Sequence, residues 1–172
     1  MEIAQRCQPI ELMLADVDGV LTDGQIVLNN QGIESKRFHI RDGMGIKLWQ
    51  KAGYQFGVLT GRSSHLVKMR VGELGIGIIR QGVDDKLAAA KEILAGLGLT
   101  LPQTCYLGDD LPDMPLVRSV GLGIAVGDAC PELRQAAHWV TSSGGGLGAV
   151  REAIEMILRA QHRWDDLIQE YR

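Results

Sequence analysis

Two aspartates near the start of the chain, Asp16 and Asp18, are the residues whose type and spacing point most directly to chemistry. They follow an apolar run at residues 10–15 that has the length and character of a buried strand. Residues i and i+2 of an extended chain point to the same side, so the two carboxylates can share one spot. Such close carboxylates repel each other unless a cation lies between them or one keeps a proton. A hard, oxygen-seeking cation such as Mg²⁺ resolves that repulsion.

The residues around this pair make the pattern more specific than an isolated D-x-D. An isolated pair is also typical of a strand that ends in a solvated acidic turn. Here the full pattern is D-V-D-G-V-L-T-D-G at residues 16–24. Gly19 allows a sharp turn and lets backbone N–H groups approach an anion. The stretch therefore favours a site that binds a cation and an anion together.

Further polar residues stand at the ends of later predicted strands, namely Thr60, Lys86, Asp109, Asp110 and Asp113. Each alone has an ordinary explanation: a helix-start threonine, a surface lysine, a solvated acidic turn. In an open α/β sheet, however, the carboxyl ends of the strands meet at one edge, where ligands bind. Together with the first two aspartates they supply a metal site, a carboxylate nucleophile, a hydroxyl donor and a cation. That set predicts phosphoryl transfer.

The elements that must position these residues alternate regularly along the chain. Strands are predicted at residues 10–15, 54–59, 76–79, 104–107, 120–126 and 139–141, and helices at 44–52, 65–74, 86–95, 131–137 and from 149 to about 168. Ser63 or Ser64 and Asp84 or Asp85 are expected to cap two of the helices. The alternation predicts an α/β fold with a doubly wound, Rossmann-like, mostly parallel sheet.

A β-hairpin is predicted at residues 25–39, directly after the first strand, around the turn sequence Asn29-Asn-Gln-Gly32. It carries Ile26, Val27, Leu28 and Ile33, which a solitary hairpin leaves exposed. We therefore expect hairpins of several subunits to pack together. The hairpin is too small for a second domain, and we expect a single domain over residues 1–172, with a C-terminal helix and tail at 149–172.

Composition narrows the class of protein. The 172 residues are 45% hydrophobic and 23% charged with a net charge of −3, as in soluble globular proteins. There is no basic run for nucleic acid, no apolar stretch long enough for a membrane span and no signal-peptide pattern. The three cysteines suggest neither a disulfide framework nor a zinc site. A cytoplasmic protein without nucleic-acid or membrane partners is expected. The glycine loop at 144–148 lies too far from the first strand to predict dinucleotide binding.

The four polar clusters, in this order, resemble the haloacid dehalogenase superfamily of phosphatases. Its first motif, D-x-D-G-x-[LV]-T-D, corresponds to residues 16–23, its hydroxyl motif to Thr60-Gly-Arg, its lysine to Lys86, and its acidic motif to residues 108–113. Many members carry a large cap domain inserted after the first motif or before the lysine. Here those gaps have room only for the hairpin and for one helix and one strand. The resemblance is therefore to a capless member.

This resemblance implies a role for each motif residue. Asp16 attacks phosphorus and forms an aspartyl-phosphate. Asp18 protonates the leaving group, later activates water, and contributes its backbone carbonyl to the Mg²⁺ site. Asp16 and Asp109 supply the side-chain metal ligands. The remaining roles are phosphoryl-oxygen binding by Thr60 and Lys86 and orientation of Lys86 by Asp113.

Over most of its length the chain is similar to the family of 3-deoxy-D-manno-octulosonate 8-phosphate phosphatases. The matching segments are residues 38–47, 60–62, 70, 74–76, 81–86, 108–113 and 144–152. The resemblance implies Mg²⁺-dependent hydrolysis of a phosphorylated sugar acid in lipopolysaccharide precursor synthesis. It also implies a homotetramer built through the hairpins, in which residues 159–172 can close over a neighbouring active site.

The same resemblance implies a set of substrate contacts. They are Asp18, His39, Ile40, Arg41, Asp42, Gly43, Lys47, Arg62, Arg70, Lys86 and Asp110. Arginine suits such a substrate because its guanidinium binds a carboxylate through two hydrogen bonds. Two positions depart from the family pattern: His39 stands where asparagine is expected, and Lys47 where arginine is common. A nine-carbon sialic-type sugar-acid 9-phosphate therefore remains an alternative substrate.

Two other classes of protein are alternatives. A receiver-like phospho-acceptor domain also groups aspartates, a threonine and a lysine around Mg²⁺ on a doubly wound sheet. Receivers, however, carry the phosphorylated aspartate near mid-chain, and the region around Leu59 offers none. A catalytically silent oligomeric relative is the other alternative. The complete set of motif residues argues against it.

Overall fold

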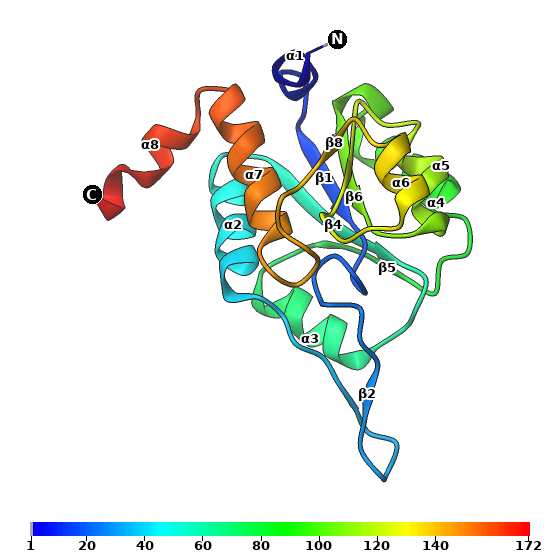
Figure 1. Ribbon diagram of the computed structural model, residues 1–172. Helices are drawn as coiled ribbons and strands as arrows, with labels where there is room; N and C mark the ends of the chain where they lie inside the picture. The colour runs from blue at the N-terminus through cyan, green and yellow to red at the C-terminus, as the bar shows by residue number, and fades with distance from the viewer. Residues whose placement is uncertain (1) are drawn as a thin grey trace.

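A six-stranded sheet with helices on both faces forms the core of the computed structural model, which describes residues 2–172 (Figure 1). Its strands are β1 (Leu12–Ala15), β4 (Gln55–Thr60), β5 (Ile78–Gln81), β6 (Thr104–Gly108), β7 (Leu122–Ala125) and β8 (Trp139–Val140). They lie in the order β5-β4-β1-β6-β7-β8, and every neighbouring pair is parallel. The predicted doubly wound parallel sheet is confirmed.

Helices cover both faces of this sheet (Figure 1). On one face lie α2 (Ile40–Lys51), α3 (His65–Glu73) and α7 (Ala149–Ala160); on the other lie α4 (Lys86–Leu97), α5 (Met114–Val117) and α6 (Pro131–Ala136). All residues of β1, β6 and β7 are buried, as expected of central parallel strands covered on both sides. No helix described in residues 2–172 is both long and apolar enough to cross a membrane.

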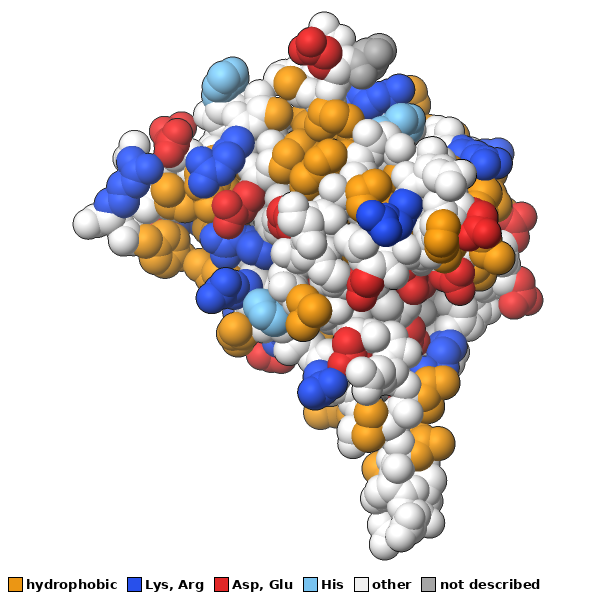
Figure 2. Space-filling model, in the orientation of Figure 1, with side chains coloured by type: hydrophobic (Ala, Val, Ile, Leu, Met, Phe, Trp, Pro, Cys, Tyr) orange, Lys and Arg blue, Asp and Glu red, His pale blue; other side chains and the backbone are white. Residues whose placement is uncertain are grey.

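The predicted hairpin projects from the end of the sheet where β1 terminates (Figure 1). Its strands, β2 (Val27–Leu28) and β3 (Glu34–Ser35), are antiparallel and shorter than predicted. Asn29 makes the turn, because its Oδ1 accepts hydrogen bonds from the backbone N–H groups of Gln31 and Ile33, both at 2.9 Å. Ile26, Val27, Leu28 and Ile33 are 46–63% exposed, and hydrophobic side chains line the protrusion in Figure 2.

The start of α2 differs from the prediction. The helix was expected at Met44, after Asp42-Gly43, but it begins at Ile40 and contains both residues. Gly43 lies where α2 and α3 approach each other closely: a Cβ there would be 2.4 Å from Nη2 of Arg70. A larger residue at position 43 would have to displace the end of the Arg70 side chain, and the helix forms here despite the low helix propensity of glycine.

The predicted C-terminal helix is in fact broken in two. α7 ends at Ala160, His162 adopts a left-handed φ of +57°, and α8 covers Trp164–Ile168. The break turns Trp164 back onto α7, where it is 3% exposed. There the guanidinium groups of Arg151 and Arg159 each lie 5.0 Å from its ring. Burial of a large aromatic ring and its contacts with two cations outweigh continuation of the helix.

The predicted helix caps are confirmed in one case and wrong in the other. Asp85 caps α4, because its Oδ1 accepts a hydrogen bond from the backbone N–H of Ala88 at 2.9 Å. Ser64 occupies the N-cap position of α3 but makes no capping bond. Its hydroxyl donates instead to Oε2 of Glu34 in the hairpin, at 2.9 Å. The short helices α1 (Ile3–Cys7) and α5 were not predicted, because four or five residues are too few to reveal helical periodicity.

Asp42 provides a tertiary cap for α7. The N-cap residue of α7 is Gly148, which has φ +104° and no side chain to accept a hydrogen bond. Asp42 lies on the neighbouring helix α2 and is 1% exposed. Its Oδ1 accepts a hydrogen bond from the backbone N–H of Arg151 at 2.8 Å. Burial raises the pKa of Asp42, and the positive end of the α7 dipole opposes that effect.

This contact predicts that Asp42 matters for stability. Asp42→Ala should lower the free energy of unfolding by about 1–2 kcal/mol, because it leaves a buried N–H group without an acceptor. Asp42→Asn should lose less, since its amide oxygen can accept the same bond. Urea unfolding followed by circular dichroism measures both values. Equal stability of Asp42→Ala and the original chain would contradict the assignment.

Candidate active site

The carboxyl ends of β1, β4 and β6 and the start of α4 surround a cavity of about 370 Å³. Most of the residues predicted for chemistry line it, namely Asp16, Asp18, Thr60, Arg62, Lys86, Asp109, Asp110 and Asp113. Side chains from four distant stretches of the sequence are thus brought to one edge of the sheet, as predicted. The parallel register accounts for this, because β1 pairs with both β4 and β6 up to its last residue, Ala15.

Lys86 holds Asp16 at the centre of this cavity. Its Nζ lies 2.9 Å from Oδ2 of Asp16 and 2.5 Å from Oδ1 of Asp113, and the lysine is 5% exposed. Burial alone would lower the pKa of Lys86, but the two carboxylates outweigh it and raise the pKa. Burial also raises the pKa of Asp16, against the effect of the lysine. The lysine therefore carries its charge and fixes the orientation of the Asp16 carboxylate.

Asp113 orients this lysine and has no free oxygen for another role. Its Oδ1 also accepts a hydrogen bond from the hydroxyl of Tyr106 at 2.6 Å. Its Oδ2 accepts from the backbone N–H groups of Asp109 and Asp110 at 2.9 and 3.2 Å. Sequence reasoning missed Tyr106, which lies in an apolar strand and carries no signal that separates it from a core residue.

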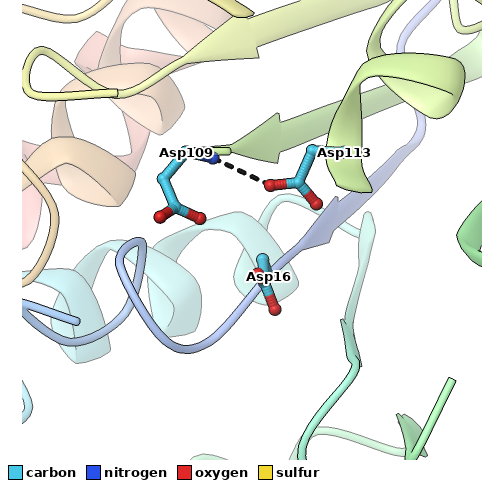
Figure 3. A group of neighbouring side chains, drawn as sticks. All are labelled: Asp16, Asp109 and Asp113. Atoms are coloured by element: carbon cyan, nitrogen blue, oxygen red, sulfur yellow. Dashed lines mark hydrogen bonds between the residues drawn. The ribbon is translucent and has the colours of Figure 1, made fainter. Parts of the chain in front are cut away.

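Asp109 lies next to the carboxylates of Asp16 and Asp113 (Figure 3). Carboxylate oxygens of Asp16, Asp109 and Asp113 all lie within 4.8 Å of one another. Burial and the negative charges of Asp113 and Asp16 raise the pKa of Asp109 to about 8. Its carboxylate occupies the space beside Gly19, where a Cβ would be 2.1 Å from Oδ2. A glycine with φ +95° is therefore required at that position.

This donor set fits a hard divalent cation. Each oxygen of Asp113 already has two hydrogen-bond donors, whereas each oxygen of Asp16 has one, so Asp16 and Asp109 are the carboxylates with capacity to bind a metal. Oxygen ligands of this kind suit Mg²⁺. A bound cation would remove the repulsion that raises the pKa of Asp109. Coordination by the backbone carbonyl of Asp18 stays a prediction.

The side chain of Asp18 contacts two cations from other segments. Its carboxylate pairs with Nζ of Lys36, and its Oδ2 lies 3.6 Å from Nη1 of Arg62. Both cations also pair with Glu34. Sequence reasoning missed Glu34 and Lys36. Their spacing of two in a strand-like segment was a signal, because it directs both charged side chains to the same side.

The other predicted substrate contacts do not reach this cavity within one chain. His39, Asp42, Gly43 and Arg70 line a space of about 10 Å³ between α2 and α3. Arg41 lies in a different surface hollow, and Ile40 and Lys47 are exposed on α2. A single chain therefore presents the phosphate-handling residues together and the predicted sugar-binding segment apart from them.

Comparison with known proteins agrees with this geometry. Residues 72–154 match the profile of haloacid dehalogenase-like hydrolases. The 3-deoxy-D-manno-octulosonate 8-phosphate phosphatase KdsC of Yersinia pestis is 45% identical over 162 residues, which are 94% of this chain and 87% of the relative. The corresponding Escherichia coli K12 protein is 41% identical over 96% of this chain and 88% of its own length.

Solved structures extend the similarity to three dimensions. The 3-deoxy-D-manno-octulosonate 8-phosphate phosphatase of Moraxella catarrhalis, in complex with magnesium ion, phosphate ion and KDO, superposes with a TM-score of 0.97. It is 44% identical, and the match covers 99% of this chain and 98% of that one. The cobalt-bound Haemophilus influenzae phosphatase gives a TM-score of 0.89 at 41% identity, covering 92% of each chain. The chain belongs to the 3-deoxy-D-manno-octulosonate 8-phosphate phosphatase family of haloacid dehalogenase-like hydrolases.

Proposed function

We propose that this protein is a Mg²⁺-dependent phosphomonoesterase that hydrolyses 3-deoxy-D-manno-octulosonate 8-phosphate to the free sugar acid and phosphate. The observation that carries the proposal is the buried Asp16 carboxylate, which Lys86 holds close to Asp109, so that the two carboxylates suit a cation. Relatives that are 41–45% identical over most of the chain bear this enzyme's name. The names of these relatives support the eight-carbon substrate over the nine-carbon alternative. Membership of a phosphatase family argues against the alternative of a receiver-like domain.

In the first step, a carboxylate oxygen of Asp16 attacks phosphorus. The bond between phosphorus and the sugar oxygen breaks, and Asp18 donates a proton to the leaving alkoxide. The products are the free sugar acid and an aspartyl-phosphate. Asp16 suits this role because Val17 N–H and Lys86 hold its two oxygens, at 2.7 and 2.9 Å, in a fixed orientation. A fixed nucleophile lowers the entropic cost of the attack.

In the second step, Asp18 accepts a proton from water, and the resulting hydroxide attacks the phosphorus of the aspartyl-phosphate. The bond between phosphorus and Asp16 breaks, which releases phosphate and restores the carboxylate. Thr60 and Lys86 hold phosphoryl oxygens through both steps. Mg²⁺, held by Asp16 and Asp109, neutralises phosphate charge when it is bound.

We infer that sugar selectivity requires assembly. The segment 39–43 and the side chains of Lys47 and Arg70 lie away from the catalytic cavity of their own chain, so they suit contacts with substrate in a neighbouring subunit. The exposed apolar hairpin suits a homotetramer, because self-association covers its side chains and strand edges. In the single chain, the tail 159–172 is docked on its own α2: Lys51 pairs with Glu170 at 2.5 Å, and Arg163 donates to the carbonyl of Ala52 at 2.9 Å.

Two broader parts of the proposal concern organisation and place. Residues 1–172 act as one domain, supported by one hydrophobic core around the six-stranded sheet that includes residues from Cys7 to Trp164. The absence of a disulfide framework from the sequence supports a reducing, cytoplasmic compartment.

Steady-state kinetics on a panel of phosphorylated sugar acids tests the function. The eight-carbon 8-phosphate should give the highest kcat/KM, above a nine-carbon 9-phosphate.

Asp16→Asn should lose turnover by roughly 10⁴-fold or more while remaining folded, because an amide is not a competent nucleophile here. Asp18→Asn should be similarly impaired by loss of proton transfer. Near-normal hydrolysis of a simple aryl phosphate by Asp16→Asn would refute the mechanism.

Removal of metal should abolish activity. A chelator should stop turnover, Mg²⁺ should restore it, and Ca²⁺ should support it poorly, because Ca²⁺ is larger and more variably coordinated. In the absence of metal, Asp109→Asn should raise the melting temperature, because it removes one negative charge from the carboxylate cluster. Each kcal/mol gained in the free energy of unfolding should add about 2–4 °C. The variant should also lose the stabilisation that Mg²⁺ confers on the original protein in thermal unfolding. Full activity in excess chelator is the contrary result.

Replacement of the hairpin turn and its apolar residues by a short Gly-Ser turn should give smaller oligomers in light scattering. These species should keep some hydrolysis of an aryl phosphate, since the phosphate-handling residues belong to one chain. They should lose most of their kcat/KM for the sugar phosphate. A monomer with unchanged sugar-phosphate kinetics would show that selectivity does not depend on assembly.

A further inference from the structure

Four charged side chains of alternating sign form a closed ring at the edge of the catalytic cavity. Lys36 pairs with Asp18 and, at 3.5 Å, with Oε1 of Glu34. Arg62 pairs with the same Glu34 oxygen at 2.7 Å and with Oδ2 of Asp18 at 3.6 Å. The ring thus has two positive and two negative members, and each cation contacts both carboxylates. We call it the charge ring.

The charge ring joins three segments that are separate in the sequence. Asp18 follows β1, Glu34 and Lys36 come from the second half of the hairpin, and Arg62 follows β4. Glu34 is also tied to the start of α3 by the hydroxyl of Ser64. The base of the hairpin is therefore fixed to the loop that carries Asp18 and to the loop after the β4 hydroxyl residue.

Three of the four members of the charge ring are largely removed from solvent, whereas the Arg62 side chain is 46% exposed. The Lys36 side chain is 1% exposed, and those of Asp18 and Glu34 are 19% and 20% exposed. A buried ammonium group is costly unless carboxylates compensate it, and here two do. Lys36 and Glu34 do not line the catalytic cavity, so they act on it through Asp18 and Arg62.

We propose that Lys36 and Glu34 are positioning residues that fix the direction of the Asp18 carboxyl group, so that its protonated form can donate to the leaving group bound in the same subunit. This inference rests on the proposed function, in which Asp18 is the general acid. It gives the hairpin a second role, because the tip presents apolar side chains for assembly while the base fixes the proton donor. Displacement of Asp18 by a fraction of an ångström would impair proton donation more than phosphate binding.

The test uses two aryl phosphates of nearly the same shape, phenyl phosphate and 4-nitrophenyl phosphate, at saturating Mg²⁺. Phenolate is the more basic leaving group, so its departure depends more on the general acid. Lys36→Met should lower kcat/KM for phenyl phosphate by about tenfold more than for 4-nitrophenyl phosphate, as part of the 10²–10⁴-fold that a general acid supplies. kcat/KM is the appropriate measure because it reports the steps up to phosphorylation of Asp16.

Two variants serve as controls. Lys36→Arg should restore most of the loss, because it keeps a cation between the two carboxylates. Arg37→Met removes a charge one residue further along the hairpin. Arg37 is exposed and pairs with Asp23 at 2.5 Å, outside the charge ring. This variant should leave the ratio of the two kcat/KM values unchanged, and light scattering should show the original assembly in each case.

Several outcomes would overturn the inference. An equal loss on both aryl phosphates, or no loss, would show that Lys36 only anchors the hairpin. If Lys36→Met fails to assemble, Glu34→Gln gives the same test, because it weakens the pairing with both cations and can keep the hydrogen bond to Ser64. An unchanged ratio of the two kcat/KM values in Glu34→Gln would refute the proposal. Failure of the original protein to hydrolyse the sugar phosphate would refute the proposed function instead.

Discussion

The concentration of negative charge at the carboxyl ends of β1 and β6 is the constraint on which the rest of the structure depends. Three carboxylates within 4.8 Å, two of them buried and that of Asp109 half-buried, would repel one another and destabilise the fold without compensation. The chain compensates with one buried lysine, a buried tyrosine hydroxyl and two backbone N–H groups, all of which contact Asp113. The repulsion that remains falls on Asp109, whose pKa it raises to about 8 together with burial. Either a proton on Asp109 or a bound cation relieves this repulsion, and the oxygen ligands suit Mg²⁺.

The same electrostatic logic recurs at the rim. Asp18 lies at the meeting point of Lys36 and Arg62, and Glu34 balances both cations. Asp16 and Asp18 are two residues apart in the sequence but have different surroundings. Asp16 is buried and pairs with Lys86, whereas Asp18 is partly exposed and belongs to the charge ring, which includes two residues of the hairpin. Different surroundings for neighbouring carboxylates are what separate a nucleophile from an acid and base. The base of the hairpin therefore contacts the catalytic cavity through Asp18, while its tip presents exposed apolar side chains.

A capless phosphatase needs contacts beyond the phosphate to distinguish one sugar phosphate from another. In a single chain the residues predicted to bind phosphate line one cavity, whereas Arg41, Lys47 and Arg70 lie outside it. Asp42, which resemblance also assigned to substrate, caps α7 and is 1% exposed. This separation is the basis for our proposal that a neighbouring subunit contributes to substrate recognition. It also explains why reaction type is easier to infer from this sequence than substrate identity.

The sequence by itself determined the parallel sheet and the convergence of Asp16, Thr60, Lys86 and Asp109. Strand and helix periods are local, and the carboxyl ends of parallel strands must meet at one edge. The start of α2, the break before Trp164 and the lost cap at Ser64 depended on partners distant in the sequence, which local propensity does not encode. The same holds for Tyr106, Glu34 and Lys36. Only the tertiary structure decided their roles, because the free energy of burying a charge depends on which groups the fold places around it.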